Sequence, residues 1–136
     1  MMQYLKVSVI IGIFCLTAAW TLQAQSTGTL PNEIIQATRD GDAFKLGEYF
    51  NAKIELVLPS NSGVYSKEQA QFMMKNFFSN YPPISFQIIH QGIRENATFA
   101  IGKYTHSKGQ FRILFLAKTE NNKTLIHQLR IELQDE

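Results

Sequence analysis

The hydrophobic pattern of this sequence changes at Ile84, from a helical period of about 3.6 residues to a strand period of about two. Before this point, residues 70–81 show the clearest helical pattern. Their apolar residues recur at helical spacing: Ala70, Met73, Met74, Phe77, Phe78 and Tyr81. After it, apolar and polar residues alternate almost to the C-terminus. Helices followed by strands are typical of an antiparallel sheet with helices packed on it, so the predicted fold class is α+β.

Helices are predicted at three places in the N-terminal half. Pro31–Arg39 has apolar residues at helical spacing and a proline in its first turn, and Ala43–Phe50 follows a glycine-containing turn. The main helix begins after Ser66, which can form a capping box with Gln69 because each side chain accepts a hydrogen bond from the other residue's backbone N–H. This helix ends near Tyr81, since two prolines follow.

Strands are predicted on both sides of the main helix. Lys53–Leu58 alternates in character, and Val64-Tyr65 is a short return strand after a turn. The C-terminal part contains four more, which are Ser85–Gln91, Thr98–Thr105, Gln110–Lys118 and Thr124–Leu133. The short polar stretches between these four suit hairpins, so they should form an antiparallel meander.

Residues 1–24 are a predicted secretory signal peptide. Met1–Lys6 carries one positive charge, Val7–Ala19 is an almost uninterrupted apolar run, and cleavage is expected before Gln25. The apolar run is too short for a membrane span. Cys15 lies within it, and the residue before this cysteine is aromatic, whereas a lipoprotein signal requires a small one. The product is expected to be exported to the periplasm or the extracellular space, without membrane attachment after cleavage.

The mature chain is predicted to be a flexible lead-in at residues 25–29, followed by one domain at residues 30–136. Its formal net charge falls from +2 to +1, because Lys6 leaves with the signal. This near balance argues against nucleic acid or an anionic membrane as a partner. Cys15 is the only cysteine, so the core must hold the exported domain without a disulfide.

Ile34–Leu56, in which Gly41-Asp42 separates two short helices ahead of a strand, resembles the opening of the nuclear-transport-factor-2-like (SnoaL-like) superfamily. Further segments resemble an exported bacterial family, the domain of unknown function 4783 family: Tyr65–Ala70, Phe77-Phe78, His90–Gly92, Phe111-Arg112 and Gln128–Glu132. The resemblance covers nearly all of the mature chain and implies a cone-shaped fold, in which a strongly bent sheet wraps around the helices. It implies export but no reaction.

Acid–base catalysis occurs in enzymes of this superfamily, and it needs a carboxylate held in an apolar pocket. Asp40 and Asp42 are expected in a turn between helices. Asp135 is close to the C-terminus, and Glu55 and Glu132 are each expected near the end of a strand. An isomerase-type pocket acid is therefore not evident. Asp40 or Asp42 could act as a base with His90; alternatively, Asp42 caps a helix and Asp40 is a turn residue.

The histidines of the sequence are His90, His106 and His127. No two of them are two or four residues apart, and no cysteine remains after cleavage, so neither a metal site nor a cofactor is predicted. His106 is expected beside a turn and in solvent. His90 is the weak catalytic candidate, because Gly92 allows the backbone to bend or approach closely. The alternative for His90 is a hydrogen-bonded structural residue.

Arg112 and Arg130 are expected on the last two strands, each between apolar neighbours. An unpaired buried charge is very unfavourable, so a buried arginine needs a partner. The two arginines could hold an anionic group of a ligand. Alternatively, they could pair with Glu132, Glu55 or a backbone carbonyl, or lie on the solvent face of the sheet. The register of the last hairpin decides whether they share a face.

Methionine and phenylalanine residues of the main helix and the sheet could line an adaptable apolar cavity inside the cone. The predicted ligand-binding residues are His90, Arg112, Arg130, Met74, Phe78, Phe86 and Phe115. The first three would supply the polar contact, and the last four the walls. The alternative is that the apolar residues fill an ordinary core.

The sequence leaves three functions open. The first is a non-enzymatic exported domain that binds a small apolar or anionic ligand in the cone. It would form a homodimer through its sheet, because Phe111–Lys118 has apolar residues on both faces. The second is a lyase- or isomerase-type enzyme with His90 as base. The third is a structural or assembly module with a filled cone.

Overall fold

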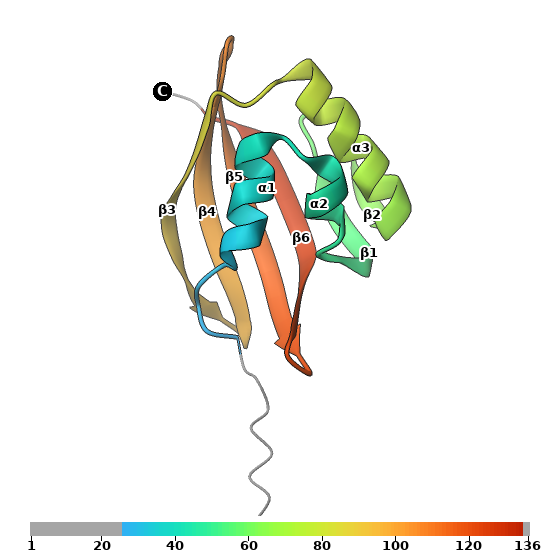
Figure 1. Ribbon diagram of the computed structural model, residues 1–136, viewed down its shortest axis with the longest axis vertical. Helices are drawn as coiled ribbons and strands as arrows, with labels where there is room; N and C mark the ends of the chain where they lie inside the picture. The colour runs from blue at the N-terminus through green and yellow to red at the C-terminus, as the bar shows by residue number, and fades with distance from the viewer. Residues whose placement is uncertain (1–25, 135–136) are drawn as a thin grey trace, which may run out of the picture.

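Helices cover one face of a curved sheet in the computed structural model, which describes residues 26–134 (Figure 1). The sheet is six-stranded and does not close on itself, in the order β2-β1-β6-β5-β4-β3. The predicted α+β class with helices packed in a curved sheet is therefore confirmed. The predicted signal peptide at residues 1–24 lies outside the described residues.

The helices are α1 (Asn32–Asp40), α2 (Ala43–Gly47) and α3 (Lys67–Asn80). The capping box of α3 is confirmed, since Ser66 and Gln69 each accept a hydrogen bond from the other's backbone N–H. Asp42 caps α2, and its Oδ1 accepts from the backbone N–H of Lys45 at 3.0 Å. α2 ends earlier than predicted because Phe50 already belongs to a strand. Within residues 26–134, no helix combines the length and hydropathy needed to cross a membrane.

The strands are β1 (Phe50–Val57), β2 (Ser62–Ser66), β3 (Ser85–Arg94), β4 (Ala97–His106), β5 (Gly109–Glu120) and β6 (Lys123–Leu133). The last four form the predicted antiparallel meander. β1 pairs in parallel with β6, which places the first and last strands side by side in the middle of the sheet. Pairing between segments so distant in the chain leaves no local signal in the sequence.

Two tight turns set the register of the meander. Glu95 and Asn96 join β3 to β4 with φ values of 52° and 62°, and Asn121 and Asn122 join β5 to β6 with φ values of 51° and 62°. Two consecutive residues with positive φ are typical of type I′ hairpins, whose twist matches that of the flanking strands. Asparagine tolerates this backbone region better than most residues. Because a two-residue turn sets the register of its two strands, these turns fix which side chains share a face.

The segment before α1 is anchored to the sheet where β4 begins and β5 ends. The Gly28 N–H donates to Thr98 Oγ1 at 3.1 Å, and the Thr119 N–H donates to Ser26 Oγ at 3.2 Å. The described part of the predicted flexible lead-in is therefore tied to β4 and β5 (Figure 1).

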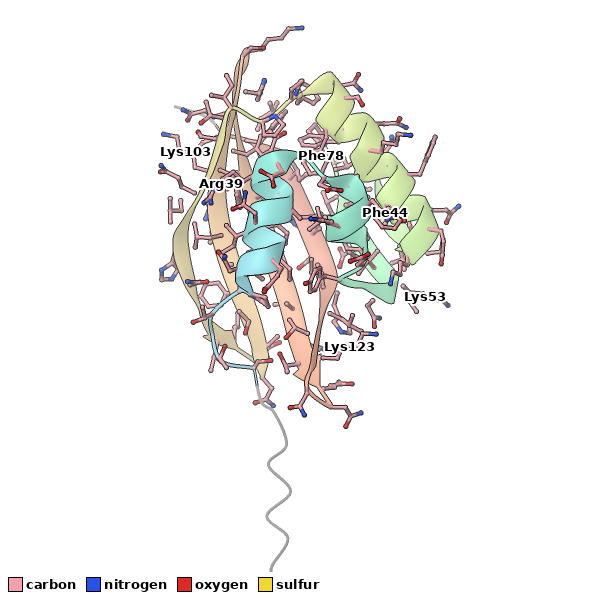
Figure 2. The ribbon with its side chains drawn as sticks, in the orientation of Figure 1. Arg39, Phe44, Lys53, Phe78, Lys103 and Lys123 are labelled. Atoms are coloured by element: carbon pink, nitrogen blue, oxygen red, sulfur yellow. The ribbon has the colours of Figure 1, made fainter. Side chains whose placement is uncertain are left out.

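The core lies between the helices and the inner face of the sheet. Phe77 packs against Tyr104 and Phe111, with ring centroids 5.6 and 5.3 Å apart. Phe77 and its neighbour Phe78 are only 5% and 6% exposed, as expected for a helix whose apolar stripe faces the sheet. Figure 2 shows side chains filling the space between α1, α3 and the strands.

Candidate functional site

The apolar residues predicted to line a cavity belong to the core. Met74, Phe86 and Phe115 are at most 1% exposed, and Phe78 is 6% exposed. The rings of Phe86 and Phe115 pack edge to face with their centroids 6.1 Å apart. Phe78 also borders a groove on the helix side of the molecule. These four residues therefore contribute first to packing.

The polar residues predicted to contact a ligand lie on the other face of the sheet. Arg112 is opposite Glu132, and Arg130 is opposite Leu114, so the two arginines share a face. The alternating neighbours of Arg112 along β5 point inward and are buried. The arginines and the cavity walls are thus separated by the sheet, and the predicted residues do not form one site.

Arg130 makes a half-exposed ion pair. Its Nη1 lies 3.2 Å from Glu132 Oε1, and the two side chains are 40% and 50% exposed. An exposed pair of this kind contributes little to stability. Arg130 Nε is buried and has no hydrogen-bond acceptor among the described residues. A hollow of about 330 Å³ lies beside these side chains, between β4, β5 and β6.

His90 also lies on the outer face. It is exposed and opposite Ile101, and its ring lies against Phe99 with centroids 5.3 Å apart. Asp40 and Asp42 lie on the helix side, where Asp42 caps α2 and Asp40 Oδ1 accepts from Gln36 Nε2 at 2.9 Å. The structure therefore does not bring His90 together with either aspartate.

The other two histidines occupy different environments. The expectation that His106 is in solvent is wrong: it is 8% exposed, its ring stacks on Phe111, and its Nδ1 accepts from the Lys108 N–H. The pKa of His127 is lowered by burial and by the Lys118 charge, against an opposing effect of Glu120. Within residues 26–134, no group of three or more His, Cys, Asp or Glu side chains is placed to hold a metal ion.

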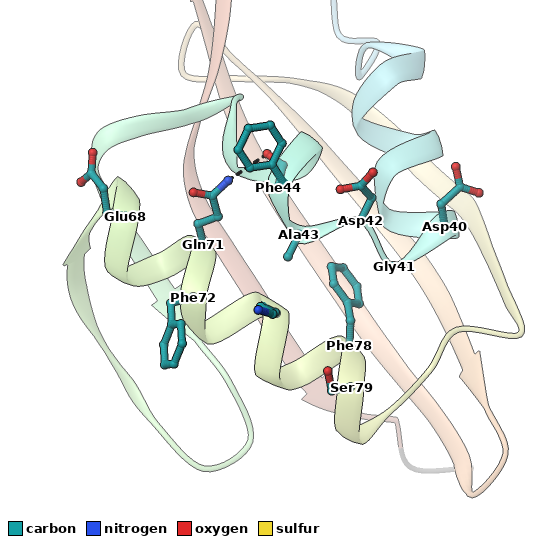
Figure 3. Close-up of a pocket in the computed structure, with 11 residues that line it drawn as sticks. Asp40, Gly41, Asp42, Ala43, Phe44, Glu68, Gln71, Phe72, Phe78 and Ser79 are labelled. Carbon is teal, nitrogen blue, oxygen red and sulfur yellow. Dashed lines mark hydrogen bonds between the residues drawn. The ribbon is translucent and has the colours of Figure 1, made fainter.

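A groove on the helix side was not foreseen from the sequence. It has a volume of about 690 Å³ and lies between α3 and the α1–α2 turn (Figure 3). Its lining includes Asp40, Asp42, Phe44, Glu68, Phe72 and Phe78. One signal could have indicated it: Phe72 is a large apolar residue outside the apolar stripe of the main helix, and it is 62% exposed.

A family model described as Domain of unknown function (DUF4783) matches residues 31–132, three quarters of the sequence. The chain belongs to the DUF4783 family. Two solved DUF4783 structures match this chain over nearly their whole length. The protein from Bacteroides uniformis is 34% identical, with a TM-score of 0.73, and the match covers 79% of this chain and 100% of that one. The protein from Bacteroides ovatus is 32% identical, with a TM-score of 0.74, and the match covers 80% and 99%.

The DUF4783 fold seen here is NTF2-like. An NTF-2-like protein of unknown function from Silicibacter pomeroyi is 12% identical, with a TM-score of 0.56, and the match covers 76% of this chain and 88% of that one. At this identity the likeness concerns the fold alone. A comparison with curated proteins finds no match.

Proposed function

We propose that this DUF4783 protein is an exported, non-enzymatic domain that works as a homodimer, paired through the outer face of its sheet. The cone is a less suitable ligand site, because the apolar residues expected to line it pack against one another and the arginines lie on the opposite face. The proposed function therefore depends on the surface of the molecule, where side chains can contact a partner.

The observation that carries this proposal is a half-buried apolar patch on the outer face, formed by Phe99, Ile101, Leu114 and Leu116. These residues are neighbours across β4 and β5. Hollows of about 330 and 420 Å³ lie over the patch. Side chains of a second copy could occupy them. The helices cover the inner face of the sheet. Apolar side chains on the outer face as well favour a partner that covers them there.

A row of charged side chains borders the apolar patch at one end. Lys103 is opposite Arg112, which is opposite Glu132, and all three project from the outer face. Figure 2 shows Lys103 on the side of the sheet away from the helices. A twofold axis through the patch would let the basic residues of one copy approach Glu132 of the other, as a self-complementary interface requires. An apolar centre with a charged rim is the usual arrangement of such interfaces.

Leu114→Arg tests the dimer, because it places a charge within the apolar patch. Light scattering on the purified protein at tens of micromolar should give twice the mass of one chain for the wild type and the mass of one chain for the variant. Val64→Arg is the control, since it introduces the same charge at an apolar strand residue outside the patch: Val64 is 68% exposed and lies on β2 at the far edge of the sheet. A monomeric wild type, or a variant that stays dimeric, would contradict the proposal.

Export is tested on the N-terminus of the product. The intact mass of protein recovered from the periplasm or medium should correspond to a chain that starts at or near Gln25. Recovery of a species that retains Cys15, or that is acylated on it, would overturn the proposed route.

A further inference from the structure

The groove on the helix side runs along one face of α3. The residues of this helix that line it are Glu68, Gln71, Phe72, Lys75, Phe78 and Ser79, which recur at helical spacing. The α1–α2 turn and α2 form the opposite wall. The positions from 68 to 79 rise by about 16 Å along the helix axis. An extended backbone covers that length with about five residues.

Two exposed phenylalanines make the groove apolar. Phe44 of α2 is 69% exposed and Phe72 of α3 is 62% exposed, whereas Phe78 is almost fully buried. Exposed aromatic rings that border the same groove offer a large apolar area to a ligand at a low entropy cost, since each has few rotatable bonds.

A glycine in α2 shapes the wall of the groove. A Cβ at Gly47 would lie 2.7 Å from Gln71 Cγ. The absence of a side chain at Gly47 therefore lets the Gln71 side chain pack against α2. There, Gln71 Nε2 donates to the Phe44 carbonyl oxygen at 2.9 Å (Figure 3). This bond fixes the side-chain amide, and its other polar atom, Oε1, remains able to accept a backbone N–H from a ligand.

The charges of the groove alternate along its length. Glu68 lies at one end, and Asp40 and Asp42 lie at the other, as Figure 3 shows. Lys75 comes between them on α3. The lining thus carries three acidic groups and one basic group, although the whole chain has a formal net charge of +2. A partner that matches this pattern has positive charges at its ends and none in its centre.

We propose that this groove binds a short extended segment of a partner protein, with two basic residues about five positions apart and apolar residues between them. The basic side chains would meet Glu68 at one end and Asp40 at the other. The apolar side chains would cover Phe44 and Phe72. This site is on the side of the sheet opposite to the proposed dimer interface, so the two proposals stand or fall separately.

A synthetic hexapeptide tests the site, with arginine at both ends, leucine, serine, valine and leucine between them, and a fluorescein label. Fluorescence anisotropy with protein purified from cells that express the full chain should give saturable binding. Binding should weaken as salt is raised, because exposed charge pairs are screened. A peptide of the same composition with its two arginines adjacent in the centre should bind more weakly, as should one with glutamates in place of the arginines.

Variants at exposed positions separate the contributions. Asp40→Asn and Glu68→Gln should each weaken binding roughly two- to five-fold, the range expected for an exposed ion pair. Phe44→Ser with Phe72→Ser should weaken it by roughly tenfold or more, since a covered phenylalanine contributes more than such a pair. Glu55→Gln is the matched control, because Glu55 is an exposed acid on β1 outside the groove lining, and it should leave binding unchanged.

Several outcomes would overturn the proposal. One is a wild type that fails to bind the hexapeptide, and another is a double phenylalanine variant, still folded by circular dichroism, that binds as well as the wild type. A third is equal binding of the glutamate peptide. Light scattering on the same samples shows whether the groove variants change the oligomeric state. If they do, the groove is a contact between copies and not a peptide site.

Discussion

Glycine at position 102 makes room for a core ring. A Cβ at this position would lie 2.5 Å from Phe86 Cζ and 3.0 Å from the Gln87 carbonyl oxygen. Gly102→Ala should therefore lower the free energy of unfolding by about 1–3 kcal/mol through overpacking, as measured by urea denaturation. In a Phe86→Leu background, Gly102→Ala should cost less than it does in the wild type, because the smaller side chain relieves the contact. Strictly additive effects of the two changes would contradict the assigned cause.

The hydroxyl of Tyr104 is buried and donates a hydrogen bond to the Tyr81 carbonyl oxygen just after α3. Tyr104→Phe leaves this carbonyl without its donor, so the free energy of unfolding at neutral pH should fall by about 1–3 kcal/mol. Burial also raises the pKa of the Tyr104 hydroxyl above 10.0. The unfolded chain therefore loses this proton first, and wild-type stability should fall as pH rises above about 10. A variant with the same alkaline loss as the wild type would contradict this assignment.

At the scale of the element, the N-terminus of α3 depends on the capping box. Ser66→Ala removes an acceptor for the Gln69 N–H, and it should lower the free energy of unfolding by about 1 kcal/mol. For a domain of this size, the midpoint of thermal unfolding should fall by about 4–8 °C. Ser79→Ala is the control, since Ser79 is exposed near the other end of the same helix. Equal shifts in both variants would show that the cap is not responsible.

Elements with strong local signals could be predicted, and pairings between distant segments could not. The spacing of Met74 and Phe78 placed the inner face of α3 correctly, and the capping box marked where that helix begins. The parallel pairing of β1 with β6 depends on contacts across most of the chain. The faces of Arg112 and Arg130 depended on a two-residue turn at Asn121, whose geometry the sequence left open.

At the scale of the whole molecule, His127 couples stability to pH. Burial and the charge of Lys118 lower the pKa of His127 below 6.5, so the unfolded chain takes up this proton first as pH falls. The free energy of unfolding should therefore decrease as pH falls through 6.5, until the folded histidine is protonated as well. His127→Gln should reduce this dependence in urea titrations, and Lys118→Met should reduce it in part. An unchanged slope in His127→Gln would contradict the assignment.

The candidate sites were harder to predict than the fold because a site depends on which side chains converge. Residue type alone suggested one cavity that combined Phe86 and Phe115 with Arg112 and Arg130. The structure separates these pairs by the thickness of the sheet. The groove beside Phe72 depends on how the α1–α2 turn packs on α3, which no local pattern encodes.

The anchored N-terminal segment has a mechanical consequence. Ser26 Oγ accepts a hydrogen bond from the Thr119 N–H near one end of β5, and the Gln134 N–H donates to the Gln110 carbonyl oxygen near the other end. The two ends of the described chain therefore lie about 30 Å apart along the strand direction. Tension applied between them pulls β6 lengthwise against both of its neighbours, so many ladder hydrogen bonds resist together instead of opening one after another. A protein held by its two ends in this way should bear load as a sheared strand, and its unfolding force should exceed that of a sheet peeled from an edge.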